Sequence, residues 1–330
     1  MSKVLTIAVA VYNIEKYLDK CLASFADDRL KDDLEVLIIN DGSKDSSQSI
    51  AEKYVEKYPS IFKLINKENG GYGTTFPVGF SNATGKYYKV VDGDDYVDTD
   101  ALCELLDTLK GIDTDIIISH ESRFDDQTVN KPLLSKYDSG HLSFNKEYPI
   151  TVLDEKSNCW LITNIVYKTS LLVDNNIQVG NRYYVDIEYD IYPLYFAKTI
   201  LFLDISITQY RFNQTGNSTN AQNVGKFANQ WMEVGKRVLD YYENHRELGN
   251  EVDSFIKKWI SFMISQVFYS LLLKQFSLST YKEFFAYSKM VKSKYSEVIS
   301  KGSLKTKIIS RFGFLYPIFV LSLRVLLIFK

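Results

Sequence analysis

Short apolar runs alternate with helix-like segments over the first 120 residues. The runs are rich in β-branched residues and have no polar alternation, which is typical of strands buried on both faces. They span residues 5–12, 34–39, 62–65, 87–91 and 115–119. Between them, apolar side chains recur at helical spacing. The sequence therefore predicts an α/β fold in which strands and helices alternate.

Three helices are predicted in this region. The first runs from about residue 14 to 25, with Asn13 as its N-cap. The second follows the strand at 34–39, and the third begins at Thr99, which is expected to cap it. The residues expected to face the sheet are Leu18, Cys21, Leu22 and Phe25, then Ile50, Ala51, Tyr54 and Tyr58, then Leu102, Leu105, Leu106 and Leu109.

Strands separated by helices favour a largely parallel sheet with right-handed crossovers. Ligands of such sheets bind outside the carboxyl ends of the strands. Asp41 and Asp92 each follow a predicted strand at that end. Their positions therefore mark the predicted binding edge.

The pattern changes after residue 120. Residues 124–149 are polar and loop-like, apolar periodicity returns at 160–172 and 183–195, and residues 201–210 predict another strand. Beyond about residue 224 the spacing is helical. We expect two domains, 1–222 (divided into the halves 1–120 and 121–222) and a helical region, 223–330.

Composition narrows the classes of function. The chain has 330 residues, 45% of them apolar, and a net charge of −2, which excludes a globally basic nucleic-acid binder. Cys21, Cys103 and Cys159 lack metal-ligand spacing and predict reduced thiols rather than a disulfide framework. The apolar start of the chain is too short for a transmembrane span and lacks the small-residue cleavage site of a signal peptide. These features predict a cytoplasmic protein.

The segment KVVDGDD, residues 89–95, concentrates three carboxylates where a buried strand ends. Side chains two apart on a strand point to the same side, so Asp92 and Asp94 are expected to converge. Gly93 between them permits close approach of a ligand. Such oxygen ligands suit Mg²⁺ or Mn²⁺, which retain substrate phosphates and waters as further ligands. A solvated acidic turn that caps the next helix is the alternative.

The segment IINDGSKDSS, residues 38–47, also ends a strand. Asp41 precedes the glycine of the turn, where its carboxylate can accept a hydrogen bond from a nucleobase imide N–H. A simple capping turn accounts for the serines of this segment but leaves Asp41 unexplained.

Taken together, the segments AVYNIEKYLDKCLASF, LIINDGSKDSS and NGGYGTTFPVGFSNATGKYYKVVDGDDYVD resemble, in this order and spacing, the family 2 glycosyltransferases. The resemblance is strong over residues 4–120, weaker over 150–220 and absent from the last third. It implies a GT-A-type, Rossmann-like mixed sheet flanked by helices, with a C-terminal helical extension. It also implies an inverting, DXD-containing enzyme of the hexosyltransferase type that uses a UDP-sugar as donor. In such an enzyme residues 1–120 are expected to bind the nucleotide-sugar donor and residues 121–222 the acceptor.

The resemblance assigns roles to individual residues. Residues expected to bind the donor are Val11, Tyr12, Asn13, Glu15, Asp41, Gly71, Asp92, Gly93, Asp94 and Arg211. Among them, Asp41 is expected to contact uracil, and Asp94 with Asp92 to hold Mn²⁺ or Mg²⁺. Arg211, in Tyr210-Arg211, belongs with Asn217-Ser218 to a segment expected to close over the donor phosphates.

The catalytic base is expected in the segment RYYVDIEYD, residues 182–190. Asp186 aligns with the aspartate that serves as the catalytic base in the family, and Glu188 is the second candidate. The alternative for Asp186 is an acid favoured by a helix N-terminus.

One position departs from the family pattern. Phe76 and Pro77 replace the Arg-Asn pair found in many members, so Lys67 or Lys89 is expected to supply the missing cation.

The last forty residues differ from the rest. Between residues 289 and 330 nine lysines or arginines accompany one acid, Glu297, and residues 312–329 are mostly apolar. A basic and apolar segment of this kind favours peripheral contact with the inner face of the cell membrane through residues 301–330. A helix packed in the core or in a subunit contact, including a homo-oligomer, is the alternative.

The predicted function is transfer of a sugar to a saccharide or lipid-linked saccharide acceptor in bacterial cell-surface polysaccharide synthesis. The alternative is a catalytically silent subunit that binds nucleotide-sugar or assists assembly of a glycosyltransferase complex.

Overall fold

The computed structural model describes residues 3–124, 133–135, 142–154, 157, 162–181, 183–212, 221–246 and 252–320. The chain forms two compact units. The first comprises Met1–Val152 and Ser157–Gln214, and the second comprises Leu153–Lys156 and Thr215–Lys330.

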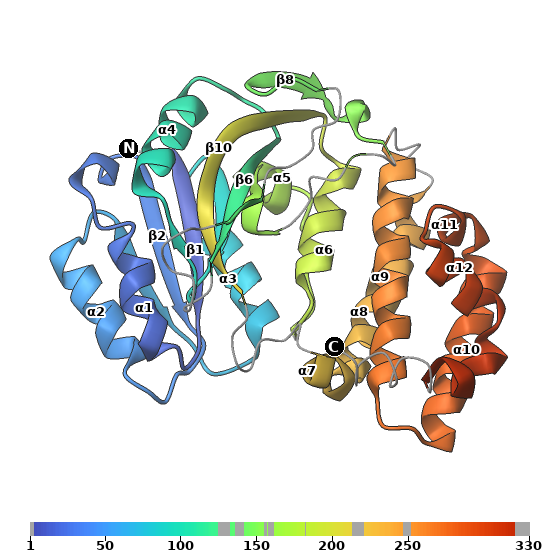
Figure 1. Cartoon of the computed structure of the whole chain (residues 1–330). Helices are drawn as coiled ribbons and strands as arrows, with labels where there is room; N and C mark the ends of the chain where they lie inside the picture. Colours follow the sequence, from blue (N-terminus) through green and yellow to red (C-terminus); the bar gives the residue numbers. More distant parts are fainter. Residues whose placement is uncertain are drawn as a thin grey trace. The chain divides into compact units, whose positions relative to one another are not determined.

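One sheet organises the first unit (Figure 1). Its strands are β1 (Leu5–Val11), β2 (Leu34–Asn40), β3 (Phe62–Asn66), β4 (Tyr87–Asp92), β5 (Tyr96–Val97), β6 (Ile116–Phe124), β7 (Leu133–Ser135), β8 (Lys146–Pro149), β9 (Ile165–Lys168) and β10 (Thr199–Arg211). The order is β3-β2-β1-β4-β9-β6-β10-β5, with β7 on β6 and β8 on β10.

The first half of the sheet is parallel, as predicted. β1 pairs in parallel with β2 and β4, and β2 pairs in parallel with β3. All seven residues of β2 are buried, because helices cover both faces of this half. The carboxyl ends of β1, β2 and β4 therefore lie at one edge.

The second half mixes both directions. β9 pairs antiparallel with β4 and with β6, and β10 pairs in parallel with β6. The resemblance predicted a mixed sheet, and this prediction is confirmed. The apolar stretch at 160–172 had not been resolved into β9, a strand of only four residues.

The helices of the first unit are α1 (Glu15–Ala23), α2 (Ser47–Lys57), α3 (Thr75–Asn82), α4 (Thr99–Lys110), α5 (Thr169–Val173) and α6 (Asp186–Ile191). Residues of α1, α2 and α4 share one hydrophobic core with the strands, and this core includes Leu18, Leu22, Ala51 and Leu105. Leu102, Leu105, Leu106 and Leu109 are buried as predicted.

Two predicted caps are wrong. Ile14, not Asn13, is the N-cap of α1, and the Asn13 side chain instead accepts the N–H of Lys44 at 2.7 Å. Asp98, not Thr99, caps α4, because its carboxylate accepts the N–H of Ala101 at 3.0 Å. In both cases the cap lies one residue away from the prediction.

The second unit is helical, as the spacing predicted. Its helices are α7 (Ala221–Lys226), α8 (Ala228–His245), α9 (Asp253–Leu273), α10 (Leu278–Lys294), α11 (Ser296–Ser300) and α12 (Leu304–Arg311), followed by the single turn η7 (Gly313–Leu315). Within the described residues, no helix combines the length and the apolar character that a membrane span requires.

Candidate active site

The loop that leaves β4 gathers the predicted acids. One carboxylate oxygen from each of Asp92, Asp94 and Asp95 lies within 4.8 Å of the others. The Tyr72 hydroxyl donates a hydrogen bond to Asp92 Oδ1 at 2.8 Å. Oδ1 of Asp95 accepts the N–H of Arg211 at 2.7 Å, whereas Oδ2 is buried and has no partner among the described residues.

Burial and mutual repulsion shape the charges of this cluster. Burial raises the pKa of Asp92 to about 7, and the neighbouring Asp94 contributes in the same direction. The pKa of Asp95 is raised well above its ordinary value by burial and then by Asp94 and Asp92. A cation placed between these groups would relieve both effects. The orphaned Asp95 oxygen and the raised pKa values therefore fit a divalent ion.

Gly93 holds the acidic loop close to β1. A Cβ atom at this position would lie 2.3 Å from Ile14 Cδ1 and 2.9 Å from the carbonyl oxygen of Ala10. The space beside Gly93 was expected to admit a ligand. In the structure, atoms of the protein itself occupy it.

Arg211, at the end of β10, fixes the acidic loop from the other side. Its Nε donates to the carbonyl oxygen of Asp94 at 2.9 Å, and its backbone N–H binds Asp95. The guanidinium carbon lies 4.6 Å from the ring centroids of both Tyr17 and Phe124. Arg211 is buried and positions the acids. Asn217 and Ser218 lie outside the described residues.

Asp186 begins α6 and lies near the acidic loop. Its charge contributes to the raised pKa values of Asp92 and Tyr72, so the fold brings residues 94 positions apart into one electrostatic site. Burial raises the pKa of Asp186 itself to about 6, although backbone N–H groups at the start of α6 act in the opposite direction.

Glu188 occupies a different environment from Asp186. It is fully buried, Oε2 accepts the N–H of Gly180 at 2.7 Å, and Oε1 accepts the Tyr192 hydroxyl at 3.1 Å. These bonds hold the loop before α6 against the helix. Arg182 lies outside the described residues.

The loops after β1 and β2 are joined by reciprocal hydrogen bonds. Glu15 accepts the N–H of Ser46 at 2.7 Å, and the N–H of Glu15 donates to Asp45 at 2.9 Å. Asn13 has a φ of 52° and binds the same loop through Lys44. Val11 is buried at the end of β1, and Tyr12 beyond it is exposed.

Asp41 organises the loop that contains Gly71. Its carboxylate accepts the N–H groups of Gly70 and Gly71, each at 2.9 Å, and forms an ion pair with Lys67. Gly71 has a φ of 96°, which favours glycine. A cleft of about 460 Å³ lies beside this arrangement. The cleft is lined by Tyr12, Gly42, Lys44, Asn66, Lys67, Glu68 and Asn69.

Phe76 fills the position of the missing arginine with apolar packing. Its ring centroid lies 5.3 Å from that of Tyr72 and 5.2 Å from that of Tyr189, and Phe80 packs against it as well. Lys89 is fully buried and donates to the carbonyl oxygen of Thr163 at 2.6 Å. Burial lowers its pKa to about 7.

Sequence reasoning had not singled out Tyr72. The tyrosine belongs to the segment NGGYG, but its bond to Asp92 joins residues 20 positions apart. Lys67 had been considered only as a replacement for the missing arginine, and its pairing with Asp41 depends on how the loop after β3 closes. Neither contact has a periodic signal in the sequence.

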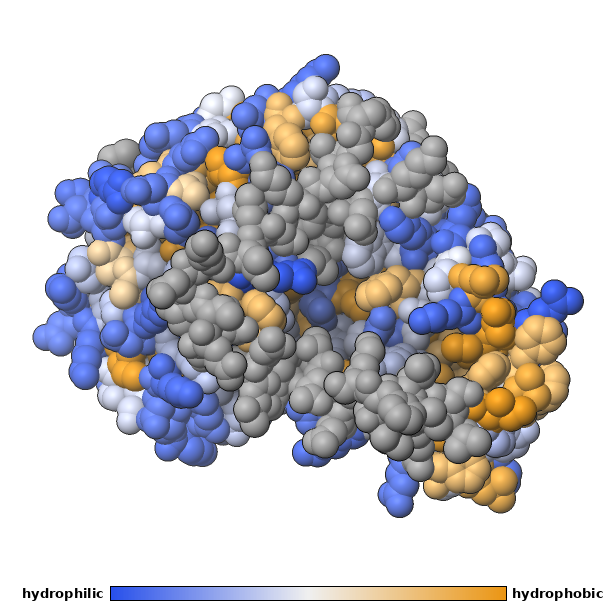
Figure 2. Space-filling model, in the orientation of Figure 1, coloured by the Kyte–Doolittle hydropathy of each residue, from blue (hydrophilic) through white to orange (hydrophobic). Residues whose placement is uncertain are grey.

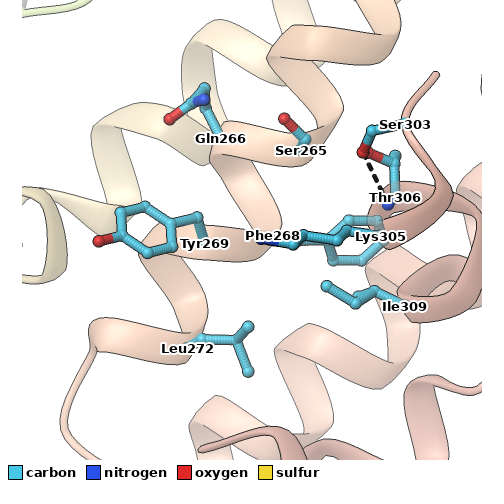
Figure 3. Close-up of a pocket in the computed structure, with 9 residues that line it drawn as sticks. All are labelled: Ser265, Gln266, Phe268, Tyr269, Leu272, Ser303, Lys305, Thr306 and Ile309. Carbon is cyan, nitrogen blue, oxygen red and sulfur yellow. Dashed lines mark hydrogen bonds between the residues drawn. The ribbon is translucent and has the colours of Figure 1, made fainter. Parts of the chain in front are cut away.

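A second cavity lies within the helical unit, between α9 and α12 (Figure 3). Its volume is about 330 Å³. The lining residues are Ser265, Gln266, Phe268, Tyr269, Leu272, Ser303, Lys305, Thr306 and Ile309. Its lining residues include no carboxylate.

Comparison with known proteins identifies the fold and the family. The model of "Glycosyl transferase family 2" matches residues 6–171, which is half of the chain and includes the acidic loop. The chain belongs to glycosyltransferase family 2. This family 2 glycosyltransferase is 26% identical to EpsH of Bacillus subtilis over 266 residues, which cover 78% of this chain and 74% of EpsH.

Staphylococcus aureus TarS is a further relative of this glycosyltransferase. TarS is named a poly(ribitol-phosphate) β-N-acetylglucosaminyltransferase, and it is 27% identical over 174 residues, which cover 52% of this chain and 29% of TarS. The chain thus spans less than a third of TarS in this alignment. A structure of TarS residues 1–349 with UDP-GlcNAc superimposes with a TM-score of 0.65 at 18% identity, covering 95% of this chain and 88% of that one.

A further solved structure shares the fold at lower similarity. The mannosyltransferase PcManGT from Pyrobaculum calidifontis, solved with GDP-Man and Mn²⁺, has a TM-score of 0.52 at 12% identity and covers 98% of this chain and 87% of that one. The GT-A fold predicted from the sequence is confirmed by the TarS structures.

Proposed function

We propose that this glycosyltransferase transfers a sugar from a UDP-sugar to a saccharide acceptor, with inversion at the anomeric carbon and with a divalent metal ion. The observation that carries the proposal is the meeting of Asp92, Asp94 and Asp95 within 4.8 Å at the carboxyl edge of the sheet. A nucleotide-sugar donor is supported by the ligand of the TarS complex, UDP-GlcNAc.

Asp94 and Asp92 would hold Mn²⁺ or Mg²⁺. When bound, such an ion stabilises the negative charge of the departing diphosphate. The buried, unpartnered oxygen of Asp95 and the raised pKa of Asp92 support a cation at this place. Mn²⁺ in the PcManGT complex supports the choice of metal.

The cleft beside Asp41 would receive the nucleotide. Asp41 Oδ2 accepts one N–H bond, from Gly71, and a carboxylate oxygen has two acceptor sites. In this proposal the second acceptor site of the buried Asp41 carboxylate would take the imide N–H of uracil. Exposed Tyr12 is one of the residues that line this cleft and offers an aromatic ring for the base.

Asp186 would accept the proton of the acceptor hydroxyl. A base works best when its pKa lies near the working pH, and burial has moved the pKa of Asp186 to about 6. Both oxygens of Glu188 already accept hydrogen bonds from the protein, which favours Asp186 for this role.

The acceptor is proposed to be a bacterial cell-surface polysaccharide or a lipid-linked precursor of one. The poly(ribitol-phosphate) acceptor in the name of TarS supports a polymer of this class.

The test is the release of UDP or GDP from a panel of UDP- and GDP-sugars in the presence of Mn²⁺, with wild-type protein and Asp94→Asn. We expect one UDP-sugar to be turned over, excess EDTA to abolish turnover, and Asp94→Asn to reduce it by about two orders of magnitude or more. Asp107→Asn changes an exposed acid of α4 and is the matched control. Undiminished turnover in EDTA would reject the metal.

A silent, nucleotide-binding subunit is the second candidate. It is favoured by Phe76, whose apolar packing puts no cation where many family members have arginine. This candidate predicts UDP binding without hydrolysis of any sugar in the panel.

A further inference from the structure

Helix α12 exposes two apolar side chains and buries two polar ones. Leu304 and Ile308 are exposed by 73% and 41%, whereas Thr306 and Ser310 are almost completely buried. The carbonyl oxygen of Ser310 accepts the hydroxyl of Ser288 on α10 at 2.9 Å. A surface helix of a globular protein normally turns its apolar side chains inward. α12 therefore packs through Thr306, Ser310 and the half-buried Ile309, and directs Leu304 and Ile308 outward.

The exposed apolar residues continue beyond α12 as one stripe, which consists of Leu304, Ile308, Phe312, Phe314 and Ile318. Phe314 and Ile318 are exposed by 55% and 57%. Figure 2 shows hydrophobic side chains gathered over the region where Figure 1 draws α10 and α12. Such contiguous apolar surface marks a docking site rather than ordinary surface.

Cations flank the stripe on both sides. At 100° per residue, Lys305 lies on one side of the line through Leu304 and Ile308, and Lys307 and Arg311 lie on the other. All three are exposed, and α12 contains no acid. Lys305 also lines the cavity between α9 and α12 (Figure 3).

The acids of the neighbouring helices do not neutralise these cations. Glu283 of α10 pairs with Lys274 at 2.8 Å, and Glu297 of α11 pairs with Lys257 at 2.9 Å. Residues 278–320 contain eight lysines or arginines and only these two acids. The surroundings of the stripe are therefore strongly positive.

We propose that the stripe docks on the surface of an anionic lipid bilayer. The apolar side chains would enter the boundary between headgroups and acyl chains, and the flanking cations would bind lipid phosphates, as in interfacial amphipathic helices. A second copy of the chain fits less well, because the stripe of one copy would bring its cations against those of the other. Residues 321–330 of this chain also fit less well as the occupant of the stripe. Their only charged side chains, Arg324 and Lys330, are cations and would be repelled by those that flank the stripe.

The test is co-sedimentation of the full chain with vesicles of phosphatidylcholine alone or with about a third phosphatidylglycerol. We expect binding to the anionic vesicles only, weakening as salt is raised. The double variant Lys305→Glu/Lys307→Glu should bind about 25-fold more weakly, or about fivefold per cation removed. Lys53→Glu/Lys57→Glu, on exposed positions of α2, makes the same change of charge in the first unit and should bind normally.

A second pair of variants tests the apolar contribution. Leu304→Ser/Ile308→Ser should weaken vesicle binding about tenfold or more, whereas Val173→Ser, at a 49% exposed residue of α5, should not. Circular dichroism checks that each variant is folded. If the serine variants do not fold, the charge variants alone test the proposal.

Three results would overturn the proposal. The first is equal binding of all variants, and the second is equal binding to both kinds of vesicle. The third is a lipid-free dimer in sedimentation equilibrium that dissociates in Leu304→Ser/Ile308→Ser, because the stripe would then be a subunit interface.

Discussion

The carboxylates of Asp92, Asp94 and Asp95 make the acidic loop costly to fold without a cation. The pKa of Asp92 is about 7 in the folded chain, and burial is the main cause. A carboxyl group whose pKa is raised on folding favours the folded state most at low pH. Its contribution is lost as the pH rises from the unfolded value, near 4, through 7.

We therefore predict a pH-dependent stabilisation by Asp94→Asn in metal-free protein. The variant should be more stable than wild type at pH 8, because one source of repulsion is gone, and the difference should shrink toward pH 5. Urea unfolding at the two pH values in EDTA measures it. Mn²⁺ should stabilise wild type at pH 8 and leave the variant nearly unchanged. A pH-independent difference would contradict this account.

The raised pKa of Asp186 predicts the acid limb of the rate profile. A base must be ionised to accept a proton, so kcat/KM should fall about tenfold per pH unit below about 6. Asp186→Asn should lose about two to four orders of magnitude and should lose this limb. Initial rates between pH 5 and 8 at saturating Mn²⁺ measure both, and Asp204→Asn changes an acid exposed by 53% as a control. A limb that survives in Asp186→Asn would assign the base elsewhere.

At the scale of elements, β1 and the loop after β4 fit together only because residue 93 is glycine. The Ala10 carbonyl oxygen and Ile14 Cδ1 occupy the space that a side chain would need. A displacement here moves Asp92 and Asp94 with it, since they flank the glycine. The geometry of the acids thus depends on packing between two elements.

Gly93→Ala should therefore reduce turnover at least tenfold and destabilise the fold by about 1–3 kcal/mol, the usual cost of overpacking. Gly111→Ala is the matched control, because its nearest neighbour would lie 3.7 Å from the added Cβ. Turnover and urea unfolding of the two variants are compared side by side. Normal turnover in Gly93→Ala would show that the loop adjusts without loss of the site.

The sequence predicted the parallel half of the sheet well. The strands at 5–12 and 34–39 are continuous apolar runs, and both faces of the observed strands are buried. β9 was harder, because four residues in an apolar stretch carry too little periodicity to define a strand. Its antiparallel insertion between β4 and β6 depends on partners far away in the chain.

In the candidate site too, contacts set by local sequence could be predicted, and contacts that depend on distant parts of the chain could not. The acids of the loop after β4 could be predicted to converge, because residues two apart on a strand share a side. The ion pair of Asp41 with Lys67 could not, since it follows from the closure of a loop. The packing of Phe76 against Tyr189 could not either, because these residues lie in α3 and α6.

At the scale of the whole molecule, the candidate site and the apolar stripe belong to different units. Every described residue proposed for the donor, the metal or the base lies in the first unit, and the stripe lies in the second. The two proposed activities should therefore be separable by substitution.

We predict that Asp94→Asn loses donor turnover and keeps its binding to anionic vesicles. Conversely, Lys305→Glu/Lys307→Glu should bind anionic vesicles about 25-fold more weakly and keep turnover of the UDP-sugar in lipid-free solution within about twofold of wild type. Donor turnover and vesicle binding are both measured for each of the two variants. Loss of both properties in either variant would mean that the units depend on each other.

The aromatic packing of Phe76 also limits which substitutions are tolerated at this position. An arginine placed at residue 76 would bury an unpaired charge among Tyr72, Phe80 and Tyr189, at a cost of several kcal/mol. Phe76→Arg alone should therefore destabilise the fold, which urea unfolding would measure. An arginine at this position would fit only together with smaller residues in place of the neighbouring rings, so residue 76 cannot be exchanged independently of its surroundings.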